Sequence, residues 1–227
     1  MVLTPEIEGT VSIRSSAGAF LEAFRHRVAA GLLTGRPHPR SNYMVAEAGS
    51  QHLEVRAADL RAHPKGRTFS LVVTASVGGE PVWTETGTLL HRGGGDPSAA
   101  RAAGPEPVGR AVPATVEWRL PGDLGRRYAA VSGDRNPIHM HPLTARAFGF
   151  PRPIAHGMWS MARCLAQLEG RLDERLEATV SFRRPVPLPG RVRFAADHRN
   201  DGSIGFALRG PGETDPALHL LGAARPL

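Results

Sequence analysis

Residues Tyr128–Met161 read YAAVSGDRNPIHMHPLTARAFGFPRPIAHGMWSM, and the rest of the chain is organised around this stretch. Within it, Asp134 and His139 are separated by Pro137 and a few neighbouring residues. Proline fixes its own φ and keeps the residue before it out of the helical region, so a helix that begins upstream is expected to end here. We therefore expect Asp134 and His139 to lie on an irregular loop, where a carboxylate and an imidazole can converge.

The second part of the stretch predicts a rigid turn that opens into a buried helix. From about His156 to Leu168 nearly every residue is apolar, which is typical of a helix that is buried on most sides. Gly157 stands at the expected start of this helix, where the first backbone N–H groups have no partner within the helix. The helix dipole favours an anion at that position, and glycine lets a ligand approach the backbone closely.

The stretch resembles the signature of the MaoC-like family, the (R)-specific enoyl-thioester hydratases and dehydratases of the hot-dog fold. The family pattern is approximately Y-x-x-x-S-G-D-x-N-P-I-H, then A-x-x-x-G-F, then P-I-A-H-G-M, and residues 128–158 match it nearly position for position. The resemblance implies an α+β hot-dog fold, in which a curved antiparallel sheet wraps around a central helix. It also implies reversible hydration of trans-2-enoyl thioesters to (3R)-3-hydroxyacyl thioesters, without a cofactor.

Three predicted catalytic residues meet the requirements of that reaction. Water must lose a proton as it attacks Cβ, Cα must gain a proton, and the thioester oxygen must be stabilised as it takes on enolate charge. Asp134 and His139 can hold one water between them, because a carboxylate accepts hydrogen bonds and a histidine accepts or donates them. The backbone N–H at Gly157 is the candidate donor to the oxyanion.

Four further residues are predicted to belong to the substrate-binding site: Ser132, Asn136, His156 and Met158. The side chain of Asn136 is expected to tie down the loop. For His156, a hydrogen bond that holds the turn is favoured over direct chemistry. Met158 belongs to an apolar helix whose side chains either pack in the core or line an acyl tunnel.

Other interpretations of the same residues remain open. Ser132–Pro137 alone is consistent with a simple turn, since its residues are turn formers. A hot-dog thioesterase would carry a carboxylate on the central helix, where only Glu169 is available, at the far end. A non-catalytic acyl-binding or dimerisation protein is a further alternative.

Several site types are not supported by the sequence. The pattern Gly-x-Ser-x-Gly of serine hydrolases is absent. His139 and His141 lack a third ligand at a recognisable spacing, so no metal site is predicted. The single cysteine, Cys164, lies on the apolar helix and is expected to be a buried, unreactive thiol.

Charge and hydropathy indicate the class of partner. The 227 residues carry a net charge of +7, from 28 basic and 21 acidic residues, without the clustered basic and aromatic residues that nucleic-acid binding would need. A positive surface suits an acyl thioester of coenzyme A or of an acidic acyl carrier protein. No apolar run approaches the ~20 residues that span a bilayer, and the N-terminus lacks the pattern of a secretory signal. We therefore expect no membrane association and a cytoplasmic location.

The order of elements predicts two related halves. A helix is expected over residues 16–33 and a loop over 35–50, followed by antiparallel strands as far as residue 91. Residues 92–111 are rich in Gly, Pro and Ala and are typical of a linker. Further strands are expected over 112–120, 177–184, 190–198, 203–209 and 217–223.

The predicted division is a diverged, shortened N-terminal hot-dog repeat (1–91), a linker (92–111) and a catalytic repeat (112–227). Larger relatives in the family that the sequence resembles contain two such repeats in one chain. We accordingly expect two curved sheets side by side, as a pseudo-dimer within the chain, or else a homodimer.

Overall fold

A computed structural model describes residues 9–15, 51–100, 104–109, 112–173, 175–212 and 216–227. The strands of the N-terminal half are β1 (Gly9–Ser15), β2 (Gln51–His63), β3 (Gly66–Val77) and β4 (Glu80–Arg92). The strands of the C-terminal half are β5 (Val116–Leu120), β6 (Leu176–Phe182), β7 (Gly190–His198), β8 (Ile204–Arg209) and β9 (Leu218–Pro226). The helices are α2 (Leu124–Ser132), α3 (Pro137–Met140), α4 (Pro142–Ala147) and α5 (Gly157–Gln167).

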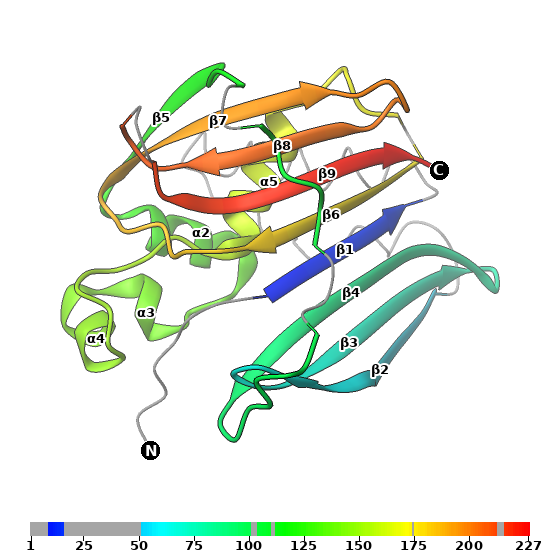
Figure 1. Cartoon of the computed structure of the whole chain (residues 1–227), viewed down its shortest axis with the longest axis horizontal. Helices are drawn as coiled ribbons and strands as arrows, with labels where there is room; N and C mark the ends of the chain where they lie inside the picture. The colour runs from blue at the N-terminus through cyan, green and yellow to red at the C-terminus, as the bar shows by residue number, and fades with distance from the viewer. Residues whose placement is uncertain (1–8, 16–50, 101–103, 110–111, 174, 213–215) are drawn as a thin grey trace.

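One antiparallel sheet contains all nine of these strands, in the order β2-β3-β4-β1-β6-β9-β8-β7-β5 (Figure 1). Strand β1 joins the two halves, because it pairs with β4 on one side and with β6 on the other. Val11, for example, lies opposite both Gly87 and Val180. The two sets of strands that were expected as sheets side by side therefore share one continuous, curved sheet.

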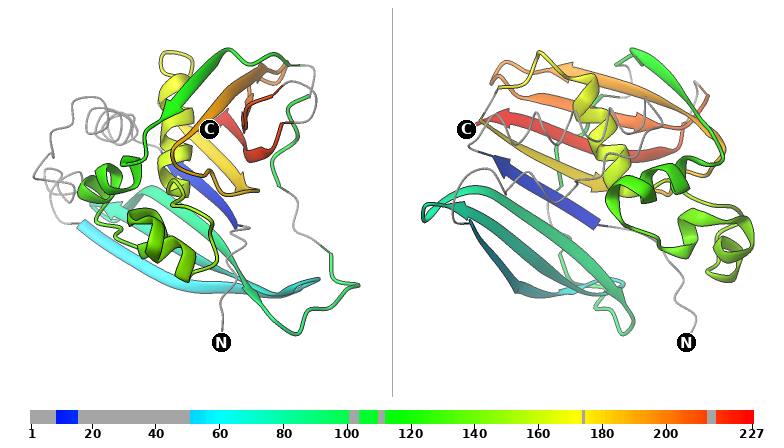
Figure 2. Two further views of the ribbon diagram at one scale, coloured as in Figure 1. Left: turned by 90° about the vertical axis from the view of Figure 1, so that its left-hand side faces the viewer. Right: turned by 180° about the vertical axis from the view of Figure 1, so that it is seen from behind.

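Helix α5 lies against one face of the C-terminal strands (Figure 2). Met161, Cys164, Leu165 and Leu168 are at most 1% exposed, and they recur at the spacing of one helix face. They pack in the main core with Trp118, Phe194 and Phe206 from the sheet. The prediction of a buried helix from His156 to Leu168 is confirmed, since these two residues are the N-cap and the C-cap of α5.

The sequence predicts a short helix capped by Asp123 and running through Val131, and α2 ends one residue later, at Ser132. Gly133 adopts a left-handed conformation, with φ of 79°, and caps the helix after Ser132. Glycine takes this conformation without the steric cost that a side chain would bring, so it ends the helix upstream of Pro137. Asp123 does occupy the N-cap position of α2, but its side chain makes no capping hydrogen bond.

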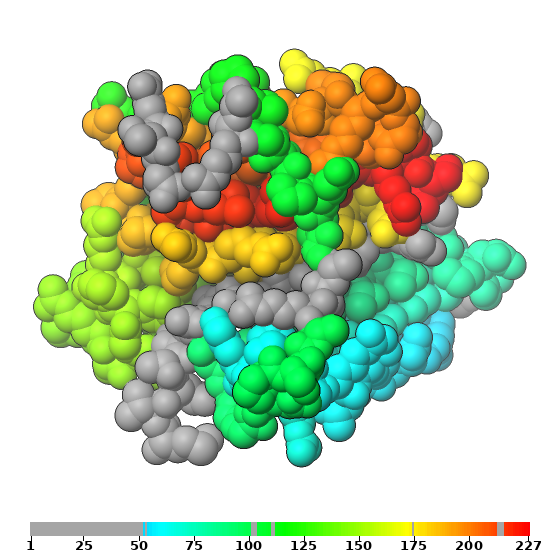
Figure 3. All heavy atoms as spheres, viewed as in Figure 1, coloured from blue at the N-terminus to red at the C-terminus, as the bar shows by residue number. Residues whose placement is uncertain are grey.

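Residues 104–109 cross the face of the sheet opposite to α5, where Figures 1 and 3 show them in green over β8 and β9. Val108 is buried there against Ala207 and Leu221. The Arg209 guanidinium donates hydrogen bonds to the carbonyl oxygens of Val108 and Gly109. This part of the predicted linker is thus fixed to the sheet by packing and by arginine–backbone hydrogen bonds.

Other predictions concern parts of the chain that the structure does not describe. The helix expected over 16–33 and the loop expected over 35–50 lie outside the described residues. The division at 91 and 112 stays a prediction. Within the described residues, no helix is long and apolar enough to cross a membrane.

Truncating the central helix should cost far more stability than truncating an exposed helix. Leu165 is 1% exposed in the core, whereas Leu143 on α4 is 66% exposed. We predict that Leu165→Ala lowers the free energy of unfolding by about 2–5 kcal/mol, because it leaves a cavity. The matched change Leu143→Ala should stay within about 0.5 kcal/mol of the wild type. Urea unfolding of both variants tests this, and equal losses would contradict the position of α5 in the core.

Candidate active site

The Asp134 carboxylate is held by a chain of hydrogen bonds that starts in α2. Ser132 Oγ donates to the Tyr128 carbonyl over 3.0 Å and accepts from the Asp134 N–H over 3.2 Å. Asp134 Oδ1 in turn accepts from the Asn136 N–H over 3.0 Å. The side chain of Asp134 remains 53% exposed, and its Oδ2 lies 3.7 Å from His156 Nε2. One carboxylate oxygen thus fixes the loop, while the other is available to a ligand.

His139 is carried by the short helix α3, not by an irregular loop as expected. Asn136 is extended, with ψ of 127°, and its side-chain oxygen accepts from the Ile138 N–H over 3.3 Å. Pro137 follows as the first residue of α3, where the missing N–H of proline is not needed. The proline and the capping asparagine therefore start a new helical turn, which directs His139 inward.

The buried His139 ring is oriented by one short hydrogen bond. Its Nδ1 lies 2.7 Å from the carbonyl oxygen of Ile154. Because a carbonyl only accepts, Nδ1 carries the proton and Nε2 keeps its lone pair in the neutral ring. Burial lowers the pKa of His139, against the smaller raising effects of the Ile154 bond and the Asp134 charge. His139 is therefore a neutral imidazole with a free acceptor nitrogen.

His156 has the opposite tautomer. Its Nε2 lies 3.0 Å from the backbone carbonyl oxygen of Asp134 and donates to it. Its Nδ1 is then the acceptor, and this buried atom has no partner among the described residues. Burial and the neighbouring His139 lower the pKa of His156 to about 4. The two imidazole rings stack with their centroids 3.7 Å apart.

The two motif segments hold each other through these histidines. His139 donates to Ile154, two residues before His156, and His156 donates to Asp134, which precedes His139. The backbone N–H of Ile154 also donates to the Ile138 carbonyl over 3.2 Å. We call this set of three hydrogen bonds the reciprocal clamp. It brings Asp134, on the surface, next to two buried imidazoles.

Three residues outside the predicted site contribute to this arrangement. A Cβ on Gly125 would overlap the carbonyl oxygen of His139, so only glycine lets α2 lie this close to α3. The Tyr128 ring lies 4.8 Å from the His156 ring. Burial, then the charges of Asp134 and Glu85, raise the pKa of Tyr128 to about 12. A packing glycine gives no chemical signal in a sequence, whereas Tyr128 is part of the quoted pattern.

Glu85 is a residue of the N-terminal half whose charge affects Tyr128. It lies on β4, and burial raises the pKa of its carboxyl. Its charge acts on Tyr128 together with that of Asp134. The electrostatic environment of the site therefore includes a residue from outside the quoted stretch.

Helix α5 begins at Gly157, as predicted. His156, its N-cap, makes no side-chain capping bond to the helix. A Cβ on Gly157 would lie 3.1 Å from the Phe182 ring, so glycine also allows the helix start to pack against β6. A small cavity of about 30 Å³ lies beside this turn, lined among others by Gly157, Phe182 and His219. Met158, the next residue, is partly buried against the main core.

A carboxylate oxygen of Asp134 and one ring nitrogen each of His139 and His156 lie within 4.8 Å of one another. Ligands of one metal ion can have this spacing. Two features disfavour a metal here. His156 Nε2 and His139 Nδ1 already donate to carbonyl oxygens. The remaining lone pairs lie in the planes of two stacked rings, 26° apart, and do not converge readily on one ion. The arrangement suits proton transfer better than metal binding.

The structure also locates Glu169, the acid considered for a thioesterase, and the single cysteine. Glu169 is exposed and follows the end of α5, so no described carboxylate on the central helix faces the sheet. Cys164 is fully buried, as predicted, and burial raises the pKa of its thiol.

Comparison with known proteins places this site in a family context. Residues 103–208 match the MaoC like domain family. The chain is 35% identical over 183 residues to 3-hydroxyacyl-thioester dehydratase X of Mycobacterium tuberculosis. This alignment covers 81% of this chain and 64% of that protein. It is 30% identical over 139 residues to enoyl-CoA hydratase ChsH3 of the same bacterium, covering 60% of this chain and 48% of that one.

A solved structure shows the same fold over nearly the whole chain. The crystal structure of HtdX of Mycobacterium tuberculosis superimposes with a TM-score of 0.68 and 29% identity, and the match covers 97% of this chain and 75% of that one. In the sequence alignments, the chain spans less than two thirds of the length of the dehydratase and of the hydratase. The hot-dog fold predicted from the sequence is confirmed.

The low pKa of His156 should make the stability of the protein depend on pH. In the unfolded chain a histidine titrates near pH 6.5, but in the folded protein His156 takes a proton only near pH 4. As the pH falls from about 6.5 to 4, the unfolded state binds this proton first, so about 3 kcal/mol of stability is lost. We predict that His156→Asn has a shallower loss of unfolding free energy over this range.

The exposed His198 provides the control, since His198→Asn should keep the wild-type dependence. Urea unfolding at several pH values measures the slope for each protein. Identical slopes for the wild type and His156→Asn would show that His156 titrates normally in the fold.

Proposed function

Because residues 103–208 match the MaoC like domain family, we propose that this chain is a MaoC-like hydratase that converts trans-2-enoyl thioesters reversibly to (3R)-3-hydroxyacyl thioesters. The observation that carries the proposal is the pairing of a solvent-accessible Asp134 carboxylate with a buried, neutral His139. A carboxylate oxygen of Asp134 and a ring nitrogen of His139 lie within 4.8 Å of each other. The names of the dehydratase and hydratase relatives support the same reaction. The R configuration follows from the resemblance of residues 128–158 to (R)-specific hydratases.

In the proposed hydration, one water lies between the two side chains. His139 Nε2, which has a lone pair, accepts one hydrogen bond from the water, and the free oxygen of Asp134 accepts the other. His139 Nε2 removes a proton as the water oxygen bonds to Cβ and the electron pair of the double bond moves to the thioester as an enolate. The imidazolium then delivers that proton to Cα, so that the elements of one water add across the double bond. Dehydration follows the same steps in reverse.

The lowered pKa of His139 suits this role. A general base must be unprotonated at the working pH, and a neutral imidazole is ready to accept a proton. The Ile154 bond fixes which nitrogen does so. The Asp134 carboxylate lies where it can stabilise the positive charge that His139 gains.

The start of α5 is the proposed oxyanion site. The N–H groups of the first helical turn lack partners within the helix, and the helix dipole favours negative charge there. Gly157 directly follows His156, whose ring stacks on His139, so this turn lies next to the acid–base pair. The Gly157 N–H would stabilise the thioester oxygen as it gains enolate charge.

We assign positioning roles to three of the four predicted substrate-binding residues. The polar side-chain atoms of Ser132, Asn136 and His156 bond to the backbone of the catalytic loop. They hold Asp134 and His139 in place, in agreement with the expected role of Asn136. Met158 is proposed to contact the acyl chain from the first turn of α5.

The proposed substrate is an acyl thioester of coenzyme A or of an acyl carrier protein, with no nucleic-acid or membrane partner. The pairing of β1 with both halves is compatible with a pseudo-dimer within one chain. A homodimer of this chain is proposed as the alternative to a pseudo-dimer. The single, buried thiol is compatible with the proposed cytoplasmic location. A thioesterase lacks support, because no described acid on α5 faces the sheet.

Removing either member of the acid–base pair should abolish most turnover. We predict that Asp134→Asn and His139→Ala each lower kcat for crotonyl-thioester hydration by about 10²–10⁴-fold, because His139→Ala removes the base and Asp134→Asn removes the charge that stabilises its protonated form. Loss of the enoyl absorbance measures the rate, and chiral chromatography of the product measures its configuration.

Matched controls are Asp123→Asn and His198→Ala, which change exposed residues outside the site. Both should retain wild-type kcat. Near-normal activity of either site variant, or a predominantly S product from the wild type, would overturn the assignment.

A side chain at Gly157 should block the oxyanion site for a reason that can be separated from packing. Gly157→Ala places a methyl group 3.1 Å from the Phe182 ring. We predict a loss of about 10²-fold in kcat, the scale for one oxyanion donor. Phe182→Leu removes the crowding, so the double variant should regain the thermal midpoint of Phe182→Leu alone. If the double variant also regained turnover, the glycine would serve packing alone.

A further inference from the structure

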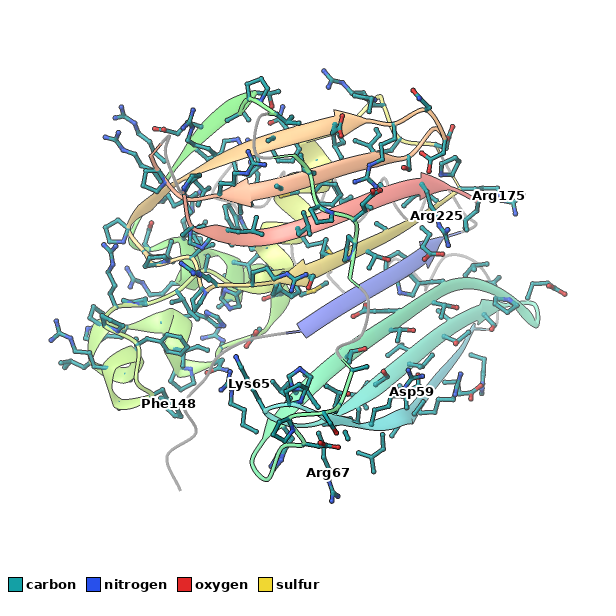
Figure 4. All side chains as sticks on the ribbon, viewed as in Figure 1. Asp59, Lys65, Arg67, Phe148, Arg175 and Arg225 are labelled. Carbon is teal, nitrogen blue, oxygen red and sulfur yellow. The ribbon has the colours of Figure 1, made fainter. Side chains whose placement is uncertain are left out.

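Helix α4 projects from the molecule beside the site (Figure 1). Ala145 is the only buried residue on this helix. Leu143 is 66% exposed and Phe148, the C-cap of the helix, is 43% exposed. Figure 4 shows Phe148 at the lower edge of this lobe. We call Leu143, Arg146 and Phe148 the α4 surface.

The segment that carries the α4 surface is rich in arginine. Residues 124–168 contain six arginines, and their single acidic residue is the catalytic Asp134. Among the described residues, no carboxylate pairs with Arg126, Arg146 or Arg152. This segment therefore has a positive net charge, and it also carries the exposed apolar side chains of Leu143 and Phe148.

Backbone hydrogen bonds hold these arginines in place. Arg126 donates to the Met140 carbonyl over 3.2 Å, Arg146 to that of Pro151 over 3.3 Å, and Arg152 to that of Pro189 over 3.1 Å. Each guanidinium has further N–H groups that remain available. An arginine that is already ordered loses less side-chain entropy when it binds a partner.

A hydrogen bond connects helix α4 to the segment that carries His139. Thr144 Oγ1 donates to the Pro137 carbonyl over 2.7 Å, and Pro137 begins the helix that carries His139. A molecule bound on α4 would therefore lie at a fixed position next to the catalytic pair.

We propose that the α4 surface docks an acidic carrier protein that presents the enoyl group on its phosphopantetheine arm. This inference rests on the proposed function and selects one of its two acyl carriers. A protein–protein contact buries apolar side chains at its centre and places charges at its rim. Leu143 and Phe148 supply the apolar centre, and the arginines supply a rim complementary to an acidic helix.

Other occupants fit this surface less well. Coenzyme A would use the arginines through its phosphates but would leave the exposed leucine without an apolar partner. A second copy of this chain would bring its own positive α4 surface against the first in a symmetric contact. Repulsion between like charges opposes that pairing.

The test compares two carriers with the same acyl group. Wild type, Leu143→Glu and Arg146→Glu are assayed with a crotonylated acyl carrier protein and with crotonyl-CoA. We predict that each variant lowers kcat/KM on the carrier-protein substrate roughly tenfold or more, through KM, because charge reversal repels the acidic partner. On crotonyl-CoA both variants should stay within about twofold of the wild type.

Arg175→Glu is the matched charge control, since Arg175 lies at the opposite end of the molecule from Phe148 in Figure 4. It should leave both substrates unaffected. Raising NaCl from about 0.05 M to 0.3 M should weaken the reaction of the wild type with the carrier protein more than that with crotonyl-CoA, because salt screens exposed charges.

Binding is measured separately with fluorescently labelled carrier protein, by anisotropy, so that docking is tested without turnover. Equal losses on both substrates, or unchanged carrier-protein binding in the two α4 variants, would overturn the docking surface. Dimers that dissociate in Leu143→Glu, with unchanged carrier-protein binding, would assign the surface to a second copy instead. Absence of hydration with either substrate would contradict the proposed function, while the binding result would still decide the docking proposal.

Discussion

The crossed hydrogen bonds between two histidines and two backbone carbonyls hold the site together. His139 binds the Ile154 carbonyl, and His156 binds the Asp134 carbonyl, so each motif segment is fixed by the other. Both rings are buried, and the low dielectric of the interior strengthens each bond. Because the second segment leads directly into α5, the reciprocal clamp also fixes the helix start at Gly157 relative to Asp134 and His139.

The same packing determines the protonation of the site. Two imidazoles with centroids 3.7 Å apart cannot both be charged without strong repulsion, and burial disfavours charge on either ring. Both pKa values are therefore lowered, and both rings are neutral. The accessible Asp134 carries the negative charge next to them. A neutral base, a nearby carboxylate and a helix N-terminus together provide the groups that hydration of an enoyl thioester needs.

The sequence predicted much of the fold and most of the side chains that the structure brings together in the site, because these leave local patterns. The apolar run of α5, the strands of the C-terminal half and the Asp–His pair were all visible as spacing and residue type. Packing relations were not visible. Gly125, for example, allows the close approach of α2 to the His139 carbonyl. Likewise, no pattern showed that backbone atoms of Ile154 and Asp134 would orient the histidines, since every residue has a carbonyl.

Nitrogen NMR of the imidazole side chains at neutral pH tests the central claim most directly, because it reports charge and tautomer separately for each ring. The reciprocal clamp predicts two neutral rings of opposite tautomer, with the proton on Nδ1 of His139 and on Nε2 of His156. Assignment of the signals follows from single-histidine variants. A charged imidazolium at either position, or a proton on Nε2 of His139, would contradict the clamp and remove the proposed base.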